Sequence, residues 1–286
     1  MTSAQKQIST IHKTIQTLSI DVVAGAIAVG YFASRMLEIE PNPIWWFILP
    51  AAVWSFYTLD HLIDGYKSKG KTEIYRHRFH FKYGKLLLTL SVFFGLAALL
   101  LSLFFLDQQI IILGLLLGGL VLAYFTSLFF WGNKKLLLLQ KELVIALVYI
   151  FGIWLAPLVW SGQFPGTSTV FVIGIFILLA WAEGIMASYF DYENDLKDGH
   201  SSFTVLFGKQ FSRRFLIVLN ILIFLIIKAS IFFISTNLQF TALMILALMN
   251  LTLLLITLYP DWLQKHERYR IVGESVFLLP ALLVFF

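Results

Sequence analysis

Residues 169–190, TVFVIGIFILLAWAEGIMASYF, form an apolar run in which only Glu183 carries a charge, and the acidic segment DYENDLKD follows it directly at 191–198. A helix of about 20 mostly apolar residues crosses the hydrocarbon core of a bilayer, which is about 30 Å thick. The run is therefore predicted to span a membrane. The segment after it then places a cluster of carboxylates at the membrane surface.

The remainder of the chain has the same character. Hydrophobic residues make up 59% of the 286 residues and charged residues 13%, against about 45–50% and about 25% in soluble domains. These proportions exclude a soluble enzyme, a disordered chain and a coiled coil. They predict an all-α, polytopic membrane protein that forms a single membrane-embedded domain over 1–286. About nine transmembrane helices are expected, at roughly 15–33, 44–62, 86–106, 109–131, 142–160, 169–190, 214–236, 240–259 and 271–286.

The positions of the basic residues predict the orientation. With nine spans, one side of the membrane collects every Lys and Arg except Arg35 and Lys228. Loops rich in Lys and Arg remain in the cytoplasm. The N-terminus and the acidic clusters are therefore predicted to be cytoplasmic. The net charge of +5 is explained by this topology, so no nucleic-acid partner is predicted, and nothing in the sequence indicates an obligate protein partner.

Two acidic clusters end predicted spans on this cytoplasmic side. Asp60 and Asp64 end the second span, and Asp191, Asp195 and Asp198 follow the sixth. Residues four apart share a helical face, where like charges repel, and the cost rises near a bilayer core. Mg²⁺ neutralises such carboxylates and is bound by one or two of them together with substrate phosphates. We expect two facing carboxylate pairs to hold cations around a diphosphate; the alternative is that both clusters are solvated helix ends.

The second cluster belongs to a longer motif. Asp191-x-Glu193-x-Asp195, then Gly199, then Phe203-Thr204-Val205-Leu206-Phe207-Gly208-Lys209 resembles the second aspartate-rich motif of the UbiA superfamily of intramembrane prenyltransferases. The predicted nine spans with a cytoplasmic N-terminus are similar to that family as well. The resemblance implies a ring of helices around a central cavity that opens sideways into lipid. It also implies Mg²⁺-dependent transfer of a prenyl group from a prenyl diphosphate to a lipophilic, often aromatic, acceptor within the membrane.

The resemblance assigns roles to individual residues. It implies that the metal-binding and catalytic carboxylates are Asp60, Asp64, Asp191 and Asp195. It implies that the substrate-binding residues are Lys67, Arg76, Arg78, Tyr124, Lys134, Lys135, Lys197 and Asp198. The chain departs from the family at Phe56 and Tyr57, where the first motif has Asn-Asp, and at Leu128, where a Lys is expected four residues after the Tyr.

Other functions remain open at this stage. A non-catalytic descendant of the same fold would bind an isoprenoid or another lipid without turnover. A CDP-alcohol phosphotransferase requires Asp-x-x-Asp-Gly and further Asp residues soon afterwards, but Asp60 is one residue too far from Asp64-Gly65 and no Asp lies between Asp64 and Asp107. A transporter is disfavoured because no pair of spans is interrupted by Gly and Pro. The acceptor, the prenyl chain length and the oligomeric state are not indicated.

Several polar residues outside these motifs also have two interpretations. Glu183, inside a predicted span, either faces the cavity and orients an acceptor or is a hydrogen-bonded core residue. Lys141 and Glu142 are expected to form a solvated start of the fifth span; the alternative is that this short stretch touches the basic loop. His77 and His80 are either metal ligands or, as is more common for His in an Arg-rich loop, residues that contact phosphate or lipid headgroups.

Overall fold

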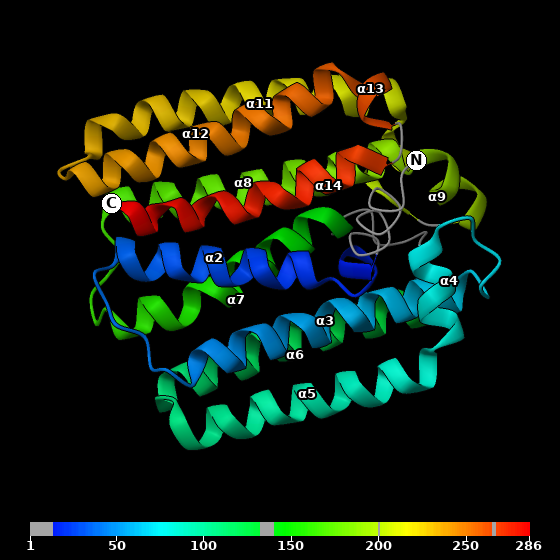
Figure 1. Cartoon of the computed structure of the whole chain (residues 1–286), viewed down its shortest axis with the longest axis horizontal. Coiled ribbons are helices and arrows are strands. Elements are labelled where there is room, and N and C mark those ends of the chain that lie inside the picture. Colours follow the sequence, from blue (N-terminus) through cyan, green and yellow to red (C-terminus); the bar gives the residue numbers. More distant parts are fainter. Residues whose placement is uncertain (1–13, 132–139, 200, 265–266) are drawn as a thin grey trace, which may run out of the picture. The chain divides into compact units, whose positions relative to one another are not determined.

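The computed structural model describes residues 14–131, 140–199, 201–264 and 267–286, and these residues form helices and turns without a strand (Figure 1). The long helices are α2 (Ile20–Met36), α3 (Trp45–Lys67), α5 (Gly84–Phe105), α6 (Gln108–Trp131), α7 (Lys141–Trp160), α8 (Thr167–Phe190), α11 (Lys209–Ser230) and α12 (Asn237–Leu258). The shorter elements are α4 (Tyr75–Lys82), α9 (Tyr192–Asp198), α10 (Phe203–Phe207), η1 (Ile231–Phe233), α13 (Pro260–Gln264), α14 (Arg268–Ser275) and η3 (Val276–Phe285). Each of the nine predicted spans overlaps one of the long helices or the α14–η3 segment.

Among the residues that the structure describes, five helical segments are long and apolar enough to cross a membrane: α5, α7, α8, α11 with η1, and α12. The prediction of an all-α membrane protein is therefore confirmed. That all nine segments cross, and in which direction, stays a prediction. Helix α3 is long enough to cross but less apolar, because its C-terminal part carries Asp60, His61 and Asp64.

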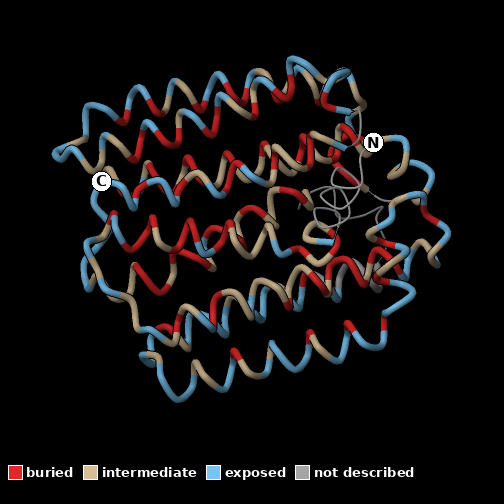
Figure 2. Tube along the Cα trace, in the orientation of Figure 1, coloured by how far each residue is buried: buried red, intermediate tan, exposed pale blue. Residues whose placement is uncertain are grey.

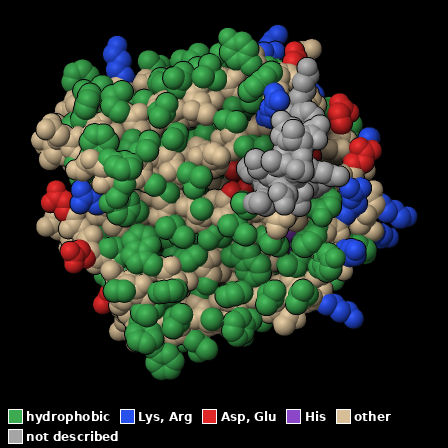
Figure 3. All heavy atoms as spheres, in the orientation of Figure 1, with side chains coloured by type: hydrophobic (Ala, Val, Ile, Leu, Met, Phe, Trp, Pro, Cys, Tyr) green, Lys and Arg blue, Asp and Glu red, His purple; other side chains and the backbone are tan. Residues whose placement is uncertain are grey.

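The apolar surface is extensive. Large hydrophobic side chains such as Phe93 and Phe104 on α5 and Leu120 on α6 are more than half exposed, and Figure 3 shows hydrophobic side chains spread over the visible face. Soluble proteins rarely expose contiguous apolar patches of this extent. These faces are suited to lipid.

The contacts within the chain separate it into two compact units. The first unit comprises residues 1–27 and 43–106, and the second comprises residues 28–42 and 107–286. In the first unit α3 packs against α4 and α5. The ring of Trp54 meets Phe94 edge-on at 5.3 Å between centroids, and Ser91 Oγ on α5 donates to the Ser55 carbonyl on α3 at 3.0 Å.

Helix α8 is the central helix of the second unit. It packs against α7, α11, α12 and α14, and Figure 2 shows many buried residues along it. Phe176 is fully buried, with the rings of Phe32 and Trp154 at 5.1 and 6.1 Å from its centroid. This close packing holds the middle of α8, and the second acidic cluster begins at the C-terminal end of the same helix.

Candidate functional site

The first acidic cluster lies inside a helix. Helix α3 continues past the predicted end of the span to Lys67, so Asp60 and Asp64 lie one helical turn apart. Both residues are buried, with exposed fractions of 7% and 9%. A buried carboxylate needs a cation or hydrogen-bond donors to offset its loss of hydration. These two residues therefore have the setting expected of a cation-binding pair.

The basic helix α4 packs closely against α3 at Gly65, next to Asp64 in the chain. A Cβ on Gly65 would lie 2.8 Å from the carbonyl oxygen of His77 and 3.2 Å from the amide nitrogen of Phe81, so only glycine allows α4 to sit this close to α3. Arg76 and Arg78 lie on α4, and Lys67 ends α3 with an exposed side chain. Within the first unit, Arg76 and Arg78 thus lie on the helix that packs against the C-terminal part of α3, and the binding of a diphosphate by these cations stays a prediction.

Three buried histidines pack beside the first cluster. The ring centroid of His61 lies 5.3 Å from that of His80 and 6.3 Å from that of His77. His80 is 1% exposed, and its Nδ1 donates to the Arg76 carbonyl at 2.9 Å. Burial lowers the pKa of His80, the Arg76 charge acts in the same direction, and the hydrogen bond opposes both. His77 and His80 thus form part of the α3–α4 interface, so the expected contact with lipid headgroups is wrong, whereas contact with a phosphate stays a prediction.

The second acidic cluster begins at a bend. Asp191 ends α8 and begins α9 with φ −84° and ψ 1°, and Gly199, at φ +69°, ends α9 in the left-handed region that favours glycine. Asp195 and Asp198 lie in α9, whereas Asp191 precedes it. The Asp195 amide donates to the Asp191 carbonyl at 2.9 Å, so Asp191 stands one helical turn before Asp195.

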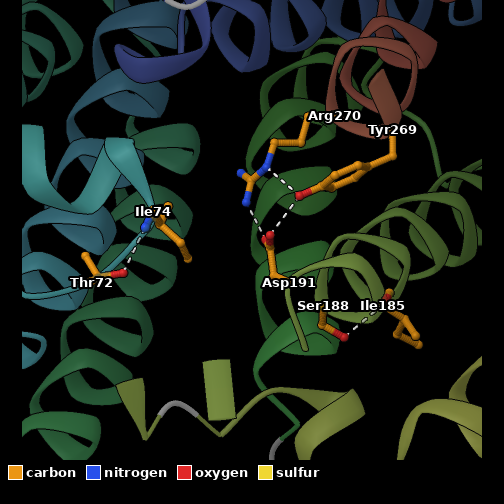
Figure 4. A network of polar contacts seen from close by, with 7 residues as sticks. All are labelled: Thr72, Ile74, Ile185, Ser188, Asp191, Tyr269 and Arg270. Atoms are coloured by element: carbon orange, nitrogen blue, oxygen red, sulfur yellow. Dashed lines mark hydrogen bonds and ion pairs between the residues drawn. The ribbon is translucent and has the colours of Figure 1, made fainter. Parts of the chain in front are cut away.

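Both carboxylate oxygens of Asp191 accept hydrogen bonds from residues that the sequence did not single out (Figure 4). The Tyr269 hydroxyl donates to Oδ1 at 2.7 Å, and Nη2 of Arg270 forms an ion pair with Oδ2. Nε of Arg270 donates to the Tyr269 oxygen at 3.0 Å. The Tyr269 ring stacks on Phe190, with centroids 4.2 Å apart and planes at 14°. In the sequence Arg270 is one more basic residue of a predicted cytoplasmic loop, so only the structure reveals its partner.

This network is buried and strongly polarised. Burial is the largest single influence on Arg270 and lowers its pKa. The charge of Asp191, together with Tyr269 and Glu274, outweighs burial, so the pKa of Arg270 lies above its ordinary value. Burial raises the pKa of Tyr269, and Asp191 acts in the same direction. At neutral pH the site therefore holds an ionised Arg270 and an un-ionised Tyr269 whose hydroxyl donates a hydrogen bond to the carboxylate.

Helix α10, which follows the second cluster, is attached to the second unit through a buried acid. Oε1 of Glu142 accepts from the Phe203 amide at 2.8 Å, and Oε2 accepts from Nε2 of Gln140 at 2.7 Å. The prediction that Glu142 is solvated is wrong, because it is 8% exposed. The first turn of α7 is covered by α8, where a Cβ on Gly184 would lie 3.1 Å from Glu142 Cβ.

A second link holds α10 to α8. The hydroxyl groups of Thr204 and Ser188 lie 2.9 Å apart, and Ser188 donates to the Ile185 carbonyl. Thr204 is therefore the donor to Ser188. Thr204 belongs to the motif that carries the family resemblance, and here it positions the segment that follows the acidic cluster.

The other predicted site residues lie in different places. Lys197 is exposed on α9, and Tyr124 is buried on α6. Lys134 and Lys135 lie outside the described residues. Glu183 faces α14, since its Oε1 lies 3.7 Å from the position of a Cβ on Gly273. The convergence of the two acidic clusters on one diphosphate stays a prediction.

The two clusters differ in how well they suit Mg²⁺. Across the described ranges no group of three or more His, Asp or Glu residues is placed to hold a metal ion by itself, but a pair of carboxylates is enough when a phosphate completes the shell. Asp60 and Asp64 provide such a pair. Oδ2 of Asp198 is buried and accepts no hydrogen bond from the described residues. An oxygen in this setting is suited to bind a cation. Asp191 does not fit, because both of its oxygens are engaged by α14.

The fold of this chain is similar to that of solved structures, although its sequence matches no family model. No family model matches the sequence, and no curated protein sequence matches it either. Two solved structures of a UbiA homologue from Archaeoglobus fulgidus are similar. The structure bound to DMAPP and Mg²⁺ has 13% identity and a TM-score of 0.62, over 96% of this chain and 97% of that one. The structure bound to GPP and Mg²⁺ has 12% identity and a TM-score of 0.61, over 96% and 98%. The chain therefore has the UbiA fold, as the sequence resemblance implied.

Proposed function

We propose that this protein is a membrane prenyltransferase, which uses Mg²⁺ to transfer a prenyl group from a prenyl diphosphate to a lipophilic acceptor. The observation that carries the proposal is the buried carboxylate pair Asp60 and Asp64 on α3, in a chain whose fold matches that of a protein bound to prenyl diphosphates and Mg²⁺. Basic residues on the neighbouring helix α4 supply further positive charge.

In the proposed reaction the chain's own residues bind and orient the diphosphate. Arg76 and Arg78 donate to phosphate oxygens, for which the planar guanidinium is well suited. Asp60 and Asp64, with Asp195 and Asp198, would hold Mg²⁺, which supplies positive charge to the oxygens of the leaving group. The bond between C1 and oxygen breaks, the diphosphate leaves with the electron pair, and the acceptor bonds to C1 and loses a proton. Exclusion of water by apolar side chains protects the allylic cation from hydrolysis.

A transfer assay in detergent or nanodiscs tests this proposal. The purified protein is incubated with radiolabelled GPP, Mg²⁺ and a lipid extract, and both labelled product and released diphosphate are measured. The double variant Asp60→Asn with Asp64→Asn is expected to lose transfer, because it removes the carboxylates but keeps their size. The control Asp261→Asn changes an exposed residue of α13. Equal transfer by the double variant and the wild type would refute the assignment of the site.

A non-catalytic function is the second candidate, and a specific observation favours it. Phe56 and Tyr57 stand where the related motif has Asn-Asp, and Asp191 is occupied by Arg270. A protein with fewer available carboxylates would bind a prenyl diphosphate or another isoprenoid without turnover. Mg²⁺-dependent binding of GPP with no release of diphosphate, with every acceptor fraction of the extract, would establish this alternative.

A further inference from the structure

The pairing of Asp191 with Arg270 is unusual in its position. Asp191 is the first acid of the cluster predicted to bind metal, and the cation beside it comes from α14, far along the chain. Both side chains are largely buried, at 10% exposure for Arg270 and 14% for Asp191. Buried ion pairs add little net stability compared with apolar residues of similar volume. Packing alone therefore does not account for a buried pair at this place.

The local structure holds the guanidinium in a defined orientation. Its Nε is fixed by the Tyr269 oxygen, and Tyr269 is fixed in turn by stacking on Phe190. Helix α14 lies close to α8, since a Cβ on Gly273 would lie 2.6 Å from Cε of Met186. Arg270 is thus presented by tightly packed elements.

The guanidinium also retains donors for a ligand. Its hydrogen bonds to described residues use Nε and Nη2. An arginine carries five N–H groups in a planar fork, so the two on Nη1 are left for another acceptor. Planar forks of this kind bind phosphate oxygens with two parallel hydrogen bonds.

We propose that Arg270 is a diphosphate-binding residue and takes the place of a divalent cation at Asp191. In this arrangement the positive charge at the start of the second cluster is part of the protein, whereas Asp60, Asp64, Asp195 and Asp198 retain the metal-binding role. The inference rests on the proposed function, because a diphosphate is the ligand that Arg270 would bind. If Arg270 supplies this charge, the protein needs fewer divalent cations to bind a diphosphate than it would with a metal ion at each of the two carboxylate clusters.

Two binding measurements test the inference without turnover. Affinity for geranyl thiolodiphosphate, a non-reactive substrate analogue, is measured by calorimetry over a range of Mg²⁺ concentrations. Bound Mn²⁺ ions are counted by electron paramagnetic resonance in the presence of the analogue. The variants are Arg270→Gln, Arg270→Lys and the double variant Asp191→Asn with Arg270→Gln. Arg268→Gln is the matched control, because Arg268 lies on the same helix with its guanidinium 4.7 Å from the Trp262 ring.

The inference predicts a distinct pattern. In Arg270→Gln, affinity at low Mg²⁺ falls by about 10- to 100-fold, as expected for loss of a charge-assisted hydrogen bond. One additional Mn²⁺ binds per chain, because Asp191 is released, and high Mg²⁺ restores part of the affinity. Arg270→Lys is intermediate, since it keeps the charge but not the fork. The double variant, in which no buried charge is left without its partner, loses affinity but binds no additional Mn²⁺.

Two other outcomes would overturn the inference. If Arg270→Gln and the double variant bind the analogue with wild-type affinity, wild-type Mg²⁺ dependence and the wild-type Mn²⁺ count, Arg270 is a structural clamp and the inference fails while the proposed function stands. If the wild-type protein does not bind the analogue at any Mg²⁺ concentration, the proposed function fails, and the inference fails with it.

Discussion

Replacing Glu142 with alanine is expected to release helix α10 from the second unit. The carboxylate accepts the Phe203 amide at 2.8 Å and the Gln140 side chain at 2.7 Å. Phe203 is 4% exposed, so in the variant its amide loses its acceptor at a place with little access to water. Gln140 is less buried than Phe203 and is better able to find water instead.

The size of the effect follows from this difference. A buried donor left without an acceptor costs about 1–3 kcal/mol. Since 1.4 kcal/mol is a factor of ten, local opening of α10 becomes about 5- to 150-fold more frequent. The Ser188–Thr204 bond remains, so the helix is expected to open locally while the rest of the unit stays folded.

Hydrogen–deuterium exchange measures this opening directly. Peptides spanning residues 201–208 are expected to exchange faster in Glu142→Ala by the factor given above, whereas α12 peptides are expected to be unchanged. Glu142→Gln is the matched control, because its amide oxygen can still accept from Phe203. Wild-type exchange over 201–208 in the alanine variant would show that this carboxylate does not hold α10.

Three further variants test other parts of the structure. Gly65→Ala places a Cβ 2.8 Å from a backbone oxygen of α4 and is expected to lower the unfolding free energy by about 1–3 kcal/mol, measured by thermal unfolding in detergent. Gly95→Ala is the control: the atom nearest to its Cβ lies 3.7 Å away, so this variant is expected to be neutral or stabilising. Because the pKa of His80 is lowered in the folded protein, the unfolded chain binds more protons near pH 6 than the folded one does. The unfolding free energy is therefore expected to fall as the pH drops below 6.5, the ordinary pKa of histidine. His80→Gln is expected to flatten this pH dependence, and an unchanged slope in the variant would contradict the reasoning. Tyr269→Phe keeps the stacking on Phe190 but removes the hydroxyl between Asp191 and Arg270, and a loss of stability of about 1.5–3 kcal/mol is expected; a wild-type melting temperature would show that the hydroxyl is dispensable.

Much of the candidate site was predictable because it is local in sequence. Asp60 and Asp64 are four residues apart on a helix, and Asp195 and Asp198 are three apart on the next acidic segment. The motif around Thr204 also pointed to the correct fold. Such features depend on helical periodicity and on short segments, which are legible without knowledge of distant contacts.

The partners of these residues were not predictable in the same way. Glu142 was expected in water because it follows a Lys at the start of a span, and only the packing of α8 and α10 against it shows that it is buried. His80 stands among arginines in the sequence but packs against His61. A charged or titratable side chain takes its environment from elements that are distant in the chain, and the hydropathy of its neighbours does not reveal them.

The sequence by itself determined that this protein is a helical membrane protein with two acidic clusters, because the apolar content and the length of each run leave few other ways to satisfy the backbone in a bilayer. Tertiary structure alone decided that Asp191 faces a cation of the protein's own. That pairing joins residues 79 positions apart, and it exists only because α14 packs against α8 closely enough to bring Arg270 to the carboxylate. The pattern of hydrophobic residues fixes where helices form, but the choice of partner for a buried charge is made by the packing between them.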